Sequence, residues 1–127
     1  MADRSAALEG VRPLALVAVG GFAGATSRYA LAVSLSTGFP WGTLAANALG
    51  SFALGALLYE AHFAGAVSAE TRLVVGTGFL SSFTTYSTFA AETAALAPPV
   101  AAANVVANYG LGAVAVLCGR ALARWVS

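Results

Sequence analysis

Apolar residues fill four long stretches of this 127-residue chain, and short polar segments separate them. Each stretch is close to the roughly 20 residues that an α-helix needs to cross a bilayer. The short connections carry turn residues, so neighbouring spans should run antiparallel and both chain ends should lie on one side. The pattern predicts an all-α membrane protein with one transmembrane domain over residues 1–127. Its four spans are expected at residues 13–35, 41–59, 73–95 and 100–123.

Local signals set the expected ends of these spans. Pro13 suits the first turn of a helix, where its missing N–H removes no hydrogen bond. Residues 61–71 are more polar than their flanks and are expected to form a loop. Residues 1–12 lack the cationic segment and cleavage site of a signal peptide, so the first span is expected to be retained.

Six Ser and Thr side chains fall within residues 81–88, in the middle of the third apolar stretch. Lipid offers no water to polar groups, so these hydroxyls must bond back to their own helix or line a polar path. Ser, Thr and the nearby Gly76 and Gly78 are poor helix formers, and a break near residues 81–84 is expected. Carbonyl groups freed by such a break can coordinate a cation.

Three asparagines also lie at membrane depth: Asn47 in the second stretch, and Asn104 and Asn108 in the fourth. The last two are four residues apart and share one helix face. Hydrogen bonding between helices is one explanation for each amide. Three amides and six hydroxyls in so small a bundle favour a polar track through the membrane.

Composition agrees with a membrane protein, since 59% of the residues are hydrophobic and only 9% are charged, against roughly 25% charged in soluble domains. The net charge of +1 gives no reason to expect nucleic acid as a partner. Every Lys or Arg position is an arginine, and all but Arg28, which lies inside the first span, fall on the side of the termini, which predicts cytoplasmic termini. These are Arg4, Arg12, Arg72, Arg120 and Arg124.

The types of polar group narrow the function. One His and five scattered carboxylates cannot assemble a nucleophile, a base and an orienting group, so an enzyme is not expected. A small proton-coupled multidrug exporter is an alternative, but it needs a carboxylate inside the first span, and residues 13–35 contain none. Neutral hydroxyl and amide donors suit a small anion.

Three segments resemble the signatures of the Fluc (CrcB-type) fluoride channel family. Residues 20–29, GGFAGATSRY, resemble GGxxGAxxRY, and residues 42–52, GTLAANALGSF, resemble GTLxxNxxGxF. Residues 78–92, GFLSSFTTYSTFAAE, are similar to GFxGGxTTFSTFxxE. The three segments follow in the family's order across the first three spans.

The resemblance implies a passive, fluoride-selective channel that exports F⁻ across the cell membrane, surrounded by lipid. It implies an antiparallel, dual-topology homodimer with two pores, in which the broken third helices cross at the centre. A structural Na⁺ would lie there, held by the backbone carbonyls of Ser81 and Thr84 from both subunits.

The resemblance also implies roles for individual side chains. Glu92 matches a glutamate at the pore mouth. Arg28 is judged from its charge instead: a buried cation usually pairs, so it is expected to tie helix ends or the dimer seam together, or to supply a positive field. The fluoride pathway would contain a pore asparagine, an aromatic pair, a hydroxyl track and polar residues of the fourth span: Asn47, Tyr86, Phe89, Ser87, Thr88, Asn104 and Asn108.

The chain departs from the family pattern at the third span. Ser81 and Ser82 replace two glycines, which would strain a break that needs positive φ. Tyr86 replaces a phenylalanine, and its hydroxyl could donate to fluoride or obstruct the path. Together with the arginine bias, Tyr86 suggests an alternative, in which this chain is the structural half of a heterodimer with an inverted homologue.

Overall fold

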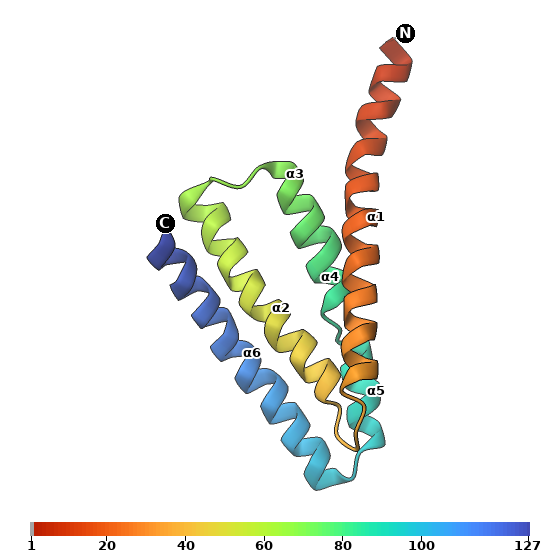
Figure 1. Cartoon of the computed structure of the whole chain (residues 1–127), viewed down its shortest axis with the longest axis vertical. Coiled ribbons are helices and arrows are strands. Elements are labelled where there is room, and N and C mark those ends of the chain that lie inside the picture. The colour runs from red at the N-terminus through yellow and green to blue at the C-terminus, as the bar shows by residue number, and fades with distance from the viewer. Residues whose placement is uncertain (1) are drawn as a thin grey trace.

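The computed structural model describes residues 2–127, which form helices joined by short connections, with no β-sheet among them (Figure 1). In chain order these are α1 (Ala2–Ser34), α2 (Trp41–Tyr59), the π-helical segment η1 (Glu60–Ala64), α3 (Ala69–Arg72), the π-helical segment η2 (Leu73–Leu80), α4 (Ser81–Phe83), α5 (Ser87–Ala95) and α6 (Pro98–Val126). Within the described part, three helical stretches are long and apolar enough to cross a membrane: Asp3–Ser34, Trp41–Ala64 and Pro98–Val126. The prediction of an all-α chain with long apolar helices is confirmed, whereas the count of four spans and the antiparallel dimer stay predictions.

The third apolar stretch is interrupted, as its composition predicts. It runs as helix through η2 and α4, loses helical geometry over residues 84–86, and resumes as α5 (Figure 1). The break therefore begins at the end of the expected interval, because Thr84 N–H and Thr84 Oγ1 both still donate to Leu80 O, at 3.0 and 2.9 Å. Thr84 itself is extended, with φ −81° and ψ 155°.

The break does not use positive φ at Ser81 or Ser82, so the strain that such a conformation would cause there does not arise. Ser81 has the helical values φ −65° and ψ −27°. Among residues 2–127 no residue other than glycine has positive φ. The chain leaves the helix into an extended conformation instead, which any residue adopts without cost.

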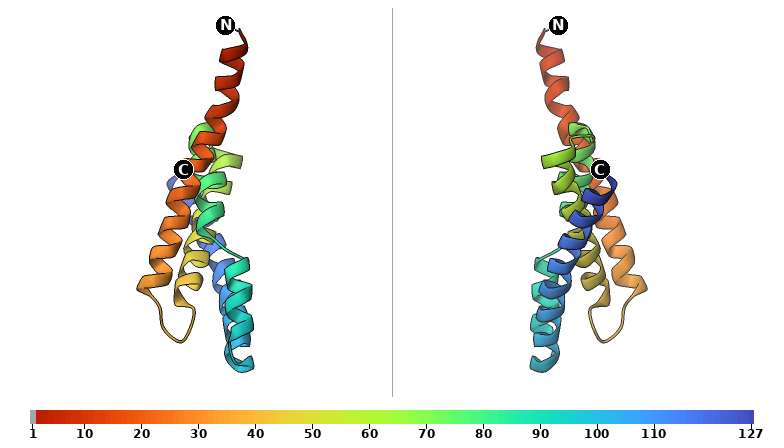
Figure 2. Two further views of the ribbon diagram at one scale, coloured as in Figure 1. Left: turned by 90° about the vertical axis from the view of Figure 1, so that its right-hand side faces the viewer. Right: turned by 90° about the vertical axis from the view of Figure 1, so that its left-hand side faces the viewer.

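The first helix is longer than its apolar stretch. It begins at Ala2, and Pro13 lies inside it rather than at its start. Residues 2–12 are rich in Ala, Leu, Glu and Arg, which favour helix, and the proline removes only one hydrogen bond from a helix of 33 residues. The extra turns project beyond the other helices in both views of Figure 2.

The second helix has the expected bounds, residues 41–59, but does not stop in a loop. It continues through η1 until Gly65, whose φ of +64° ends it in the left-handed region that glycine tolerates. The expected loop over residues 61–71 is thus confined to residues 65–68, since α3 begins at Ala69.

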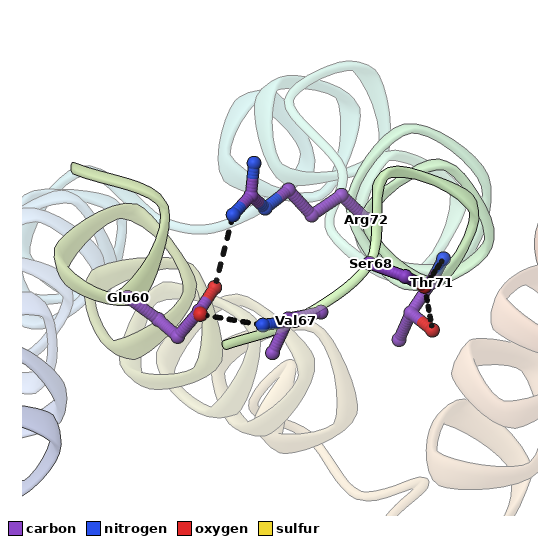
Figure 3. Close-up of polar contacts among 5 residues, drawn as sticks. All are labelled: Glu60, Val67, Ser68, Thr71 and Arg72. Atoms are coloured by element: carbon purple, nitrogen blue, oxygen red, sulfur yellow. Dashed lines mark hydrogen bonds and ion pairs between the residues drawn. The ribbon is translucent and has the colours of Figure 1, made fainter. Parts of the chain in front are cut away.

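A polar cluster closes the connection between η1 and α3 (Figure 3). Glu60 Oε1 accepts the Val67 N–H at 2.7 Å, and Glu60 Oε2 lies 3.6 Å from the Arg72 guanidinium. Ser68 Oγ caps α3 by accepting the Thr71 N–H at 3.2 Å. The cluster orients the start of the broken helix.

Glycines allow the helices to approach closely. α2 packs along α6, and α1 along η2 and α4 (Figure 1). A methyl group at Gly24 would overlap the carbonyl oxygen of Phe79, and one at Gly119 would overlap that of Phe52. Both chain ends lie toward one end of the bundle, as the short connections predict.

Gly24→Ala should therefore destabilise the fold. The added methyl group must push α1 away from η2, and overpacking of this kind costs about 1–3 kcal/mol. Gly10→Ala is the matched control, because a methyl group there meets nothing within 4 Å. Thermal unfolding in detergent should show a lower midpoint for Gly24→Ala only, and equal midpoints would contradict the packing argument.

Candidate functional site

The break in the third apolar stretch is held by one side chain of α2. Asn47 Oδ1 accepts the Thr85 N–H at 2.8 Å, and Asn47 Nδ2 donates to the Thr85 carbonyl at 3.0 Å. The amide thus pairs with Thr85 as a neighbouring β-strand would. This pairing satisfies two backbone groups that the missing helical turn leaves open.

A chain of amides continues from this contact across three helices. Asn47 Nδ2 also donates to Asn108 Oδ1 at 3.3 Å. Asn108 Nδ2 donates to the carbonyl and to Oδ1 of Asn104, both at 2.9 Å, and Asn104 Nδ2 donates to Thr93 Oγ1 at 2.9 Å. Asn104 is only 1% exposed. The chain joins α2, α6 and α5 around the break.

These contacts use most of the amide hydrogens. Each Asn side chain has two N–H donors, and both donors of Asn47 and of Asn108 go to protein acceptors. Hydrogen bonding between helices, one of the two explanations considered for the asparagines, is what the structure displays. Their exposure to a passing anion stays a prediction.

Aromatic rings gather beside the amide chain. Phe89 is 7% exposed, and its ring centroid lies 6.0 Å from that of Tyr86 and 6.1 Å from that of Tyr109. The Phe89 and Tyr109 rings meet edge to face at 84°. Tyr86 is 72% exposed, and whether its hydroxyl helps or obstructs an anion stays open to the experiments below.

Two residues of this site escaped the sequence-based reasoning. Tyr109 follows Asn108 directly, and a hydroxyl-bearing ring beside a buried amide was the available signal. Thr85 lies in the hydroxyl cluster, but it contributes to the site through its backbone N–H and carbonyl, which bond to Asn47. Its Oγ1 accepts the Thr88 N–H at 3.1 Å, at the start of α5. No sequence pattern identifies the contact between the Thr85 backbone and Asn47.

Most of these groups border one cavity of about 720 Å³. Its lining includes Asn47, Ser81, Thr84, Thr85, Tyr86, Phe89, Asn108 and Tyr109. Ser87, Thr88 and Asn104 were predicted for the same path but do not border it. Ser87 is exposed and Thr88 is half-buried.

Glu92 lies apart from this cavity. It borders a second hollow of about 400 Å³ beside the connection between α1 and α2, with Thr43 and Leu96. Its Oε2 atom is buried and has no hydrogen-bond partner among the described residues. The carboxylate is thus separate from the amides and aromatic rings.

Carbonyl groups near the break differ in their partners. Arg28 Nε donates to the Ser82 carbonyl at 3.1 Å and thereby ties α1 to α4. Within residues 2–127 the carbonyls of Ser81 and Thr84 accept no hydrogen bond. Two free carbonyl oxygens match the hard oxygen ligands that alkali cations use. The described residues offer no cluster of three or more His, Cys, Asp or Glu as an alternative metal site.

Comparison with known proteins identifies the family. The family model described as "CrcB-like protein, Camphor Resistance (CrcB)" matches residues 15–120. A Natronomonas pharaonis protein named fluoride-specific ion channel FluC 1 is 61% identical over 116 residues, covering 91% of this chain and 98% of the relative. Fluoride-specific ion channel FluC 2 of Halobacterium salinarum is 58% identical over 113 residues, covering 88% and 87%.

A bacterial relative is also similar. Fluoride-specific ion channel FluC of Thermus thermophilus is 47% identical over 91 residues, covering 68% of this chain and 71% of the relative. Relatives with this name are channels and not enzymes. Their similarity to this chain agrees with the long apolar helices described above. The chain therefore belongs to the CrcB-like family of ion channels, as a multi-pass protein of the plasma membrane.

Proposed function

We propose that this protein is a fluoride-selective channel that lets F⁻ leave the cell passively. The observation that carries the proposal is the 61% identity, over nearly the whole length of both chains, to a relative named a fluoride-specific ion channel. The site is compatible with such a role, because amide, hydroxyl and aromatic side chains gather on the wall of one otherwise largely apolar cavity.

The chemistry of these groups supports an anion that passes without being trapped. Fluoride is small and holds its water strongly, so donors must replace the water it loses. Ring edges, the positive part of the aromatic quadrupole, and the hydroxyls of Tyr86 and Tyr109 supply such contacts without a fixed charge. The Ser81 and Thr84 hydroxyls instead donate to carbonyls of their own helix. A proton-coupled exporter would need an ionisable carboxylate in the first span, which has none between residues 13 and 35.

The working unit is an antiparallel homodimer with two pathways. Support comes from the open side of the cavity, where Tyr86 is 72% and Tyr109 is 62% exposed. Rings that face the ion need a second wall, and another copy of the chain is the simplest source. A heterodimer with an inverted homologue is the alternative, which the arginine bias favours.

A structural Na⁺ belongs to the proposal. Ser81 and Thr84 would hold it through their carbonyl oxygens, which accept no hydrogen bond within residues 2–127. When bound, the ion supplies a fixed positive charge close to both anion pathways. Arg28 holds the neighbouring Ser82 carbonyl, so that group stays directed toward α1.

Purified protein reconstituted alone into liposomes should release fluoride and retain chloride. Ion-selective electrodes measure the release of each anion after a potassium ionophore is added, which lets K⁺ leave with the anion so that no opposing membrane potential builds up. Equal loss of the two anions would reject selectivity. No loss of either from this chain alone, with recovery when an inverted homologue is added, would replace the homodimer with the heterodimer.

Phe89→Ala should slow fluoride release about tenfold or more, because the ring that connects Tyr86 to Tyr109 is lost and the site beside the amides opens. Phe63→Ala is the matched control, since Phe63 lies in η1 and is 70% exposed. Release rates from liposomes with equal protein content make the comparison. An unchanged rate for Phe89→Ala would remove this ring from the pathway.

A further inference from the structure

Asn47 grips a peptide group that also belongs to the proposed cation site. The N–H accepted by Asn47 Oδ1 is that of Thr85. This N–H and the carbonyl of Thr84 are the two ends of one peptide bond. The amide of Asn47 therefore touches the same rigid unit as the Thr84 carbonyl oxygen.

The geometry of that unit fixes where the carbonyl points. The described chain has no cis peptide bond, so N–H and C=O of this peptide point in opposite directions. The N–H is directed at α2, through Asn47. The Thr84 carbonyl is consequently directed away from α2, and within residues 2–127 it accepts no hydrogen bond.

Hydrogen bonds to Asn108 and Asn104 fix the orientation of the Asn47 side chain. Asn47 Nδ2 donates both to the Thr85 carbonyl and to Asn108, and Asn108 is in turn fixed by the buried Asn104. Only one orientation of the Asn47 amide satisfies both groups of Thr85, with Oδ1 toward the N–H and Nδ2 toward the carbonyl. The orientation of the Thr84 carbonyl thus depends on Asn47.

We propose that Asn47 is a positioning residue for the cation site, which it orients through the Thr84–Thr85 peptide. This inference rests on the proposed Na⁺ site. It gives Asn47 a second part besides its predicted place on the anion path. Hydrogen bonds in a chain polarise one another, so an acceptor on the N–H makes the opposite carbonyl a stronger ligand.

The test separates cation binding from general stability. Full-length protein in detergent is unfolded by heat in sodium chloride and in choline chloride at equal ionic strength, over a series of Na⁺ concentrations. The wild-type midpoint should rise with Na⁺, because a ligand of the native state stabilises it. A purely structural role for Asn47 would lower the midpoint equally in both salts and leave the Na⁺-dependent rise intact.

Asn47→Ala should need about tenfold more Na⁺ for half of the midpoint rise, in line with the loss of one buried hydrogen bond to the ligand-bearing peptide. Ser51→Ala is the matched control. It lies one turn further along α2 and borders the same cavity, and the hydrogen bonds of Thr85 within residues 2–127 go to Asn47, Ser87 and Thr88 and not to Ser51. Its Na⁺ dependence should equal that of wild type.

Each result decides something. An Asn47→Ala protein with the wild-type Na⁺ dependence would overturn the positioning role while the Na⁺ site stands. A wild-type protein without any Na⁺ dependence would overturn both the positioning role and the Na⁺ site. The fluoride release assay in liposomes would still test the channel function separately. If Asn47→Ala does not fold, Asn47→Ser takes its place, because its shorter side chain cannot span to the Thr85 peptide, and the same outcomes apply.

Discussion

A helix that breaks inside a membrane must find partners for the peptide groups it exposes, and the pairing of Asn47 with Thr85 meets that requirement here. Water is absent from the hydrocarbon core, so each unpaired N–H or C=O would cost several kcal/mol. One asparagine satisfies two such groups at once. The other features of the site are arranged around that contact, since the amide chain behind it joins α2, α5 and α6.

Small residues allow the helices to pack closely, and polar residues connect the helices at the break. Close approach of α1 to η2 and of α2 to α6 depends on glycines whose absent side chains leave room for backbone carbonyls. The polar residues then join elements far apart in the sequence. Arg28 reaches the end of α4, and Asn47 reaches the start of the extended segment. Both contacts lie at the break, where regular backbone bonding fails.

Local sequence signals predicted the local features of this fold. The ends of α2 and the existence of a break follow from hydrophobic length and from a run of Ser and Thr. Pro13 was misread, because a proline that suits a helix start can also lie inside a membrane-spanning helix. The three asparagines were singled out from their depth in the membrane alone, and their place on an anion path stays a prediction.

Their partners were beyond prediction, because they depend on tertiary geometry. Asn47 and Thr85 are 38 residues apart, and nothing in either segment specifies that an amide will meet that particular peptide. Tyr109 was overlooked for the same reason, since its relation to Phe89 appears only once α5 and α6 are packed. The resemblance to a family supplied roles, and the fold supplied the contacts.

The pairing of Asn47 with Thr85 also affects how two subunits would associate. Within one chain, α2 shapes the break through Asn47, so in the proposed dimer the extended segment would need no second chain to form. Association then costs less conformational entropy than it would if the partner had to order this segment. The two halves of a dimer would meet as preorganised surfaces, and assembly would resemble docking more than coupled folding.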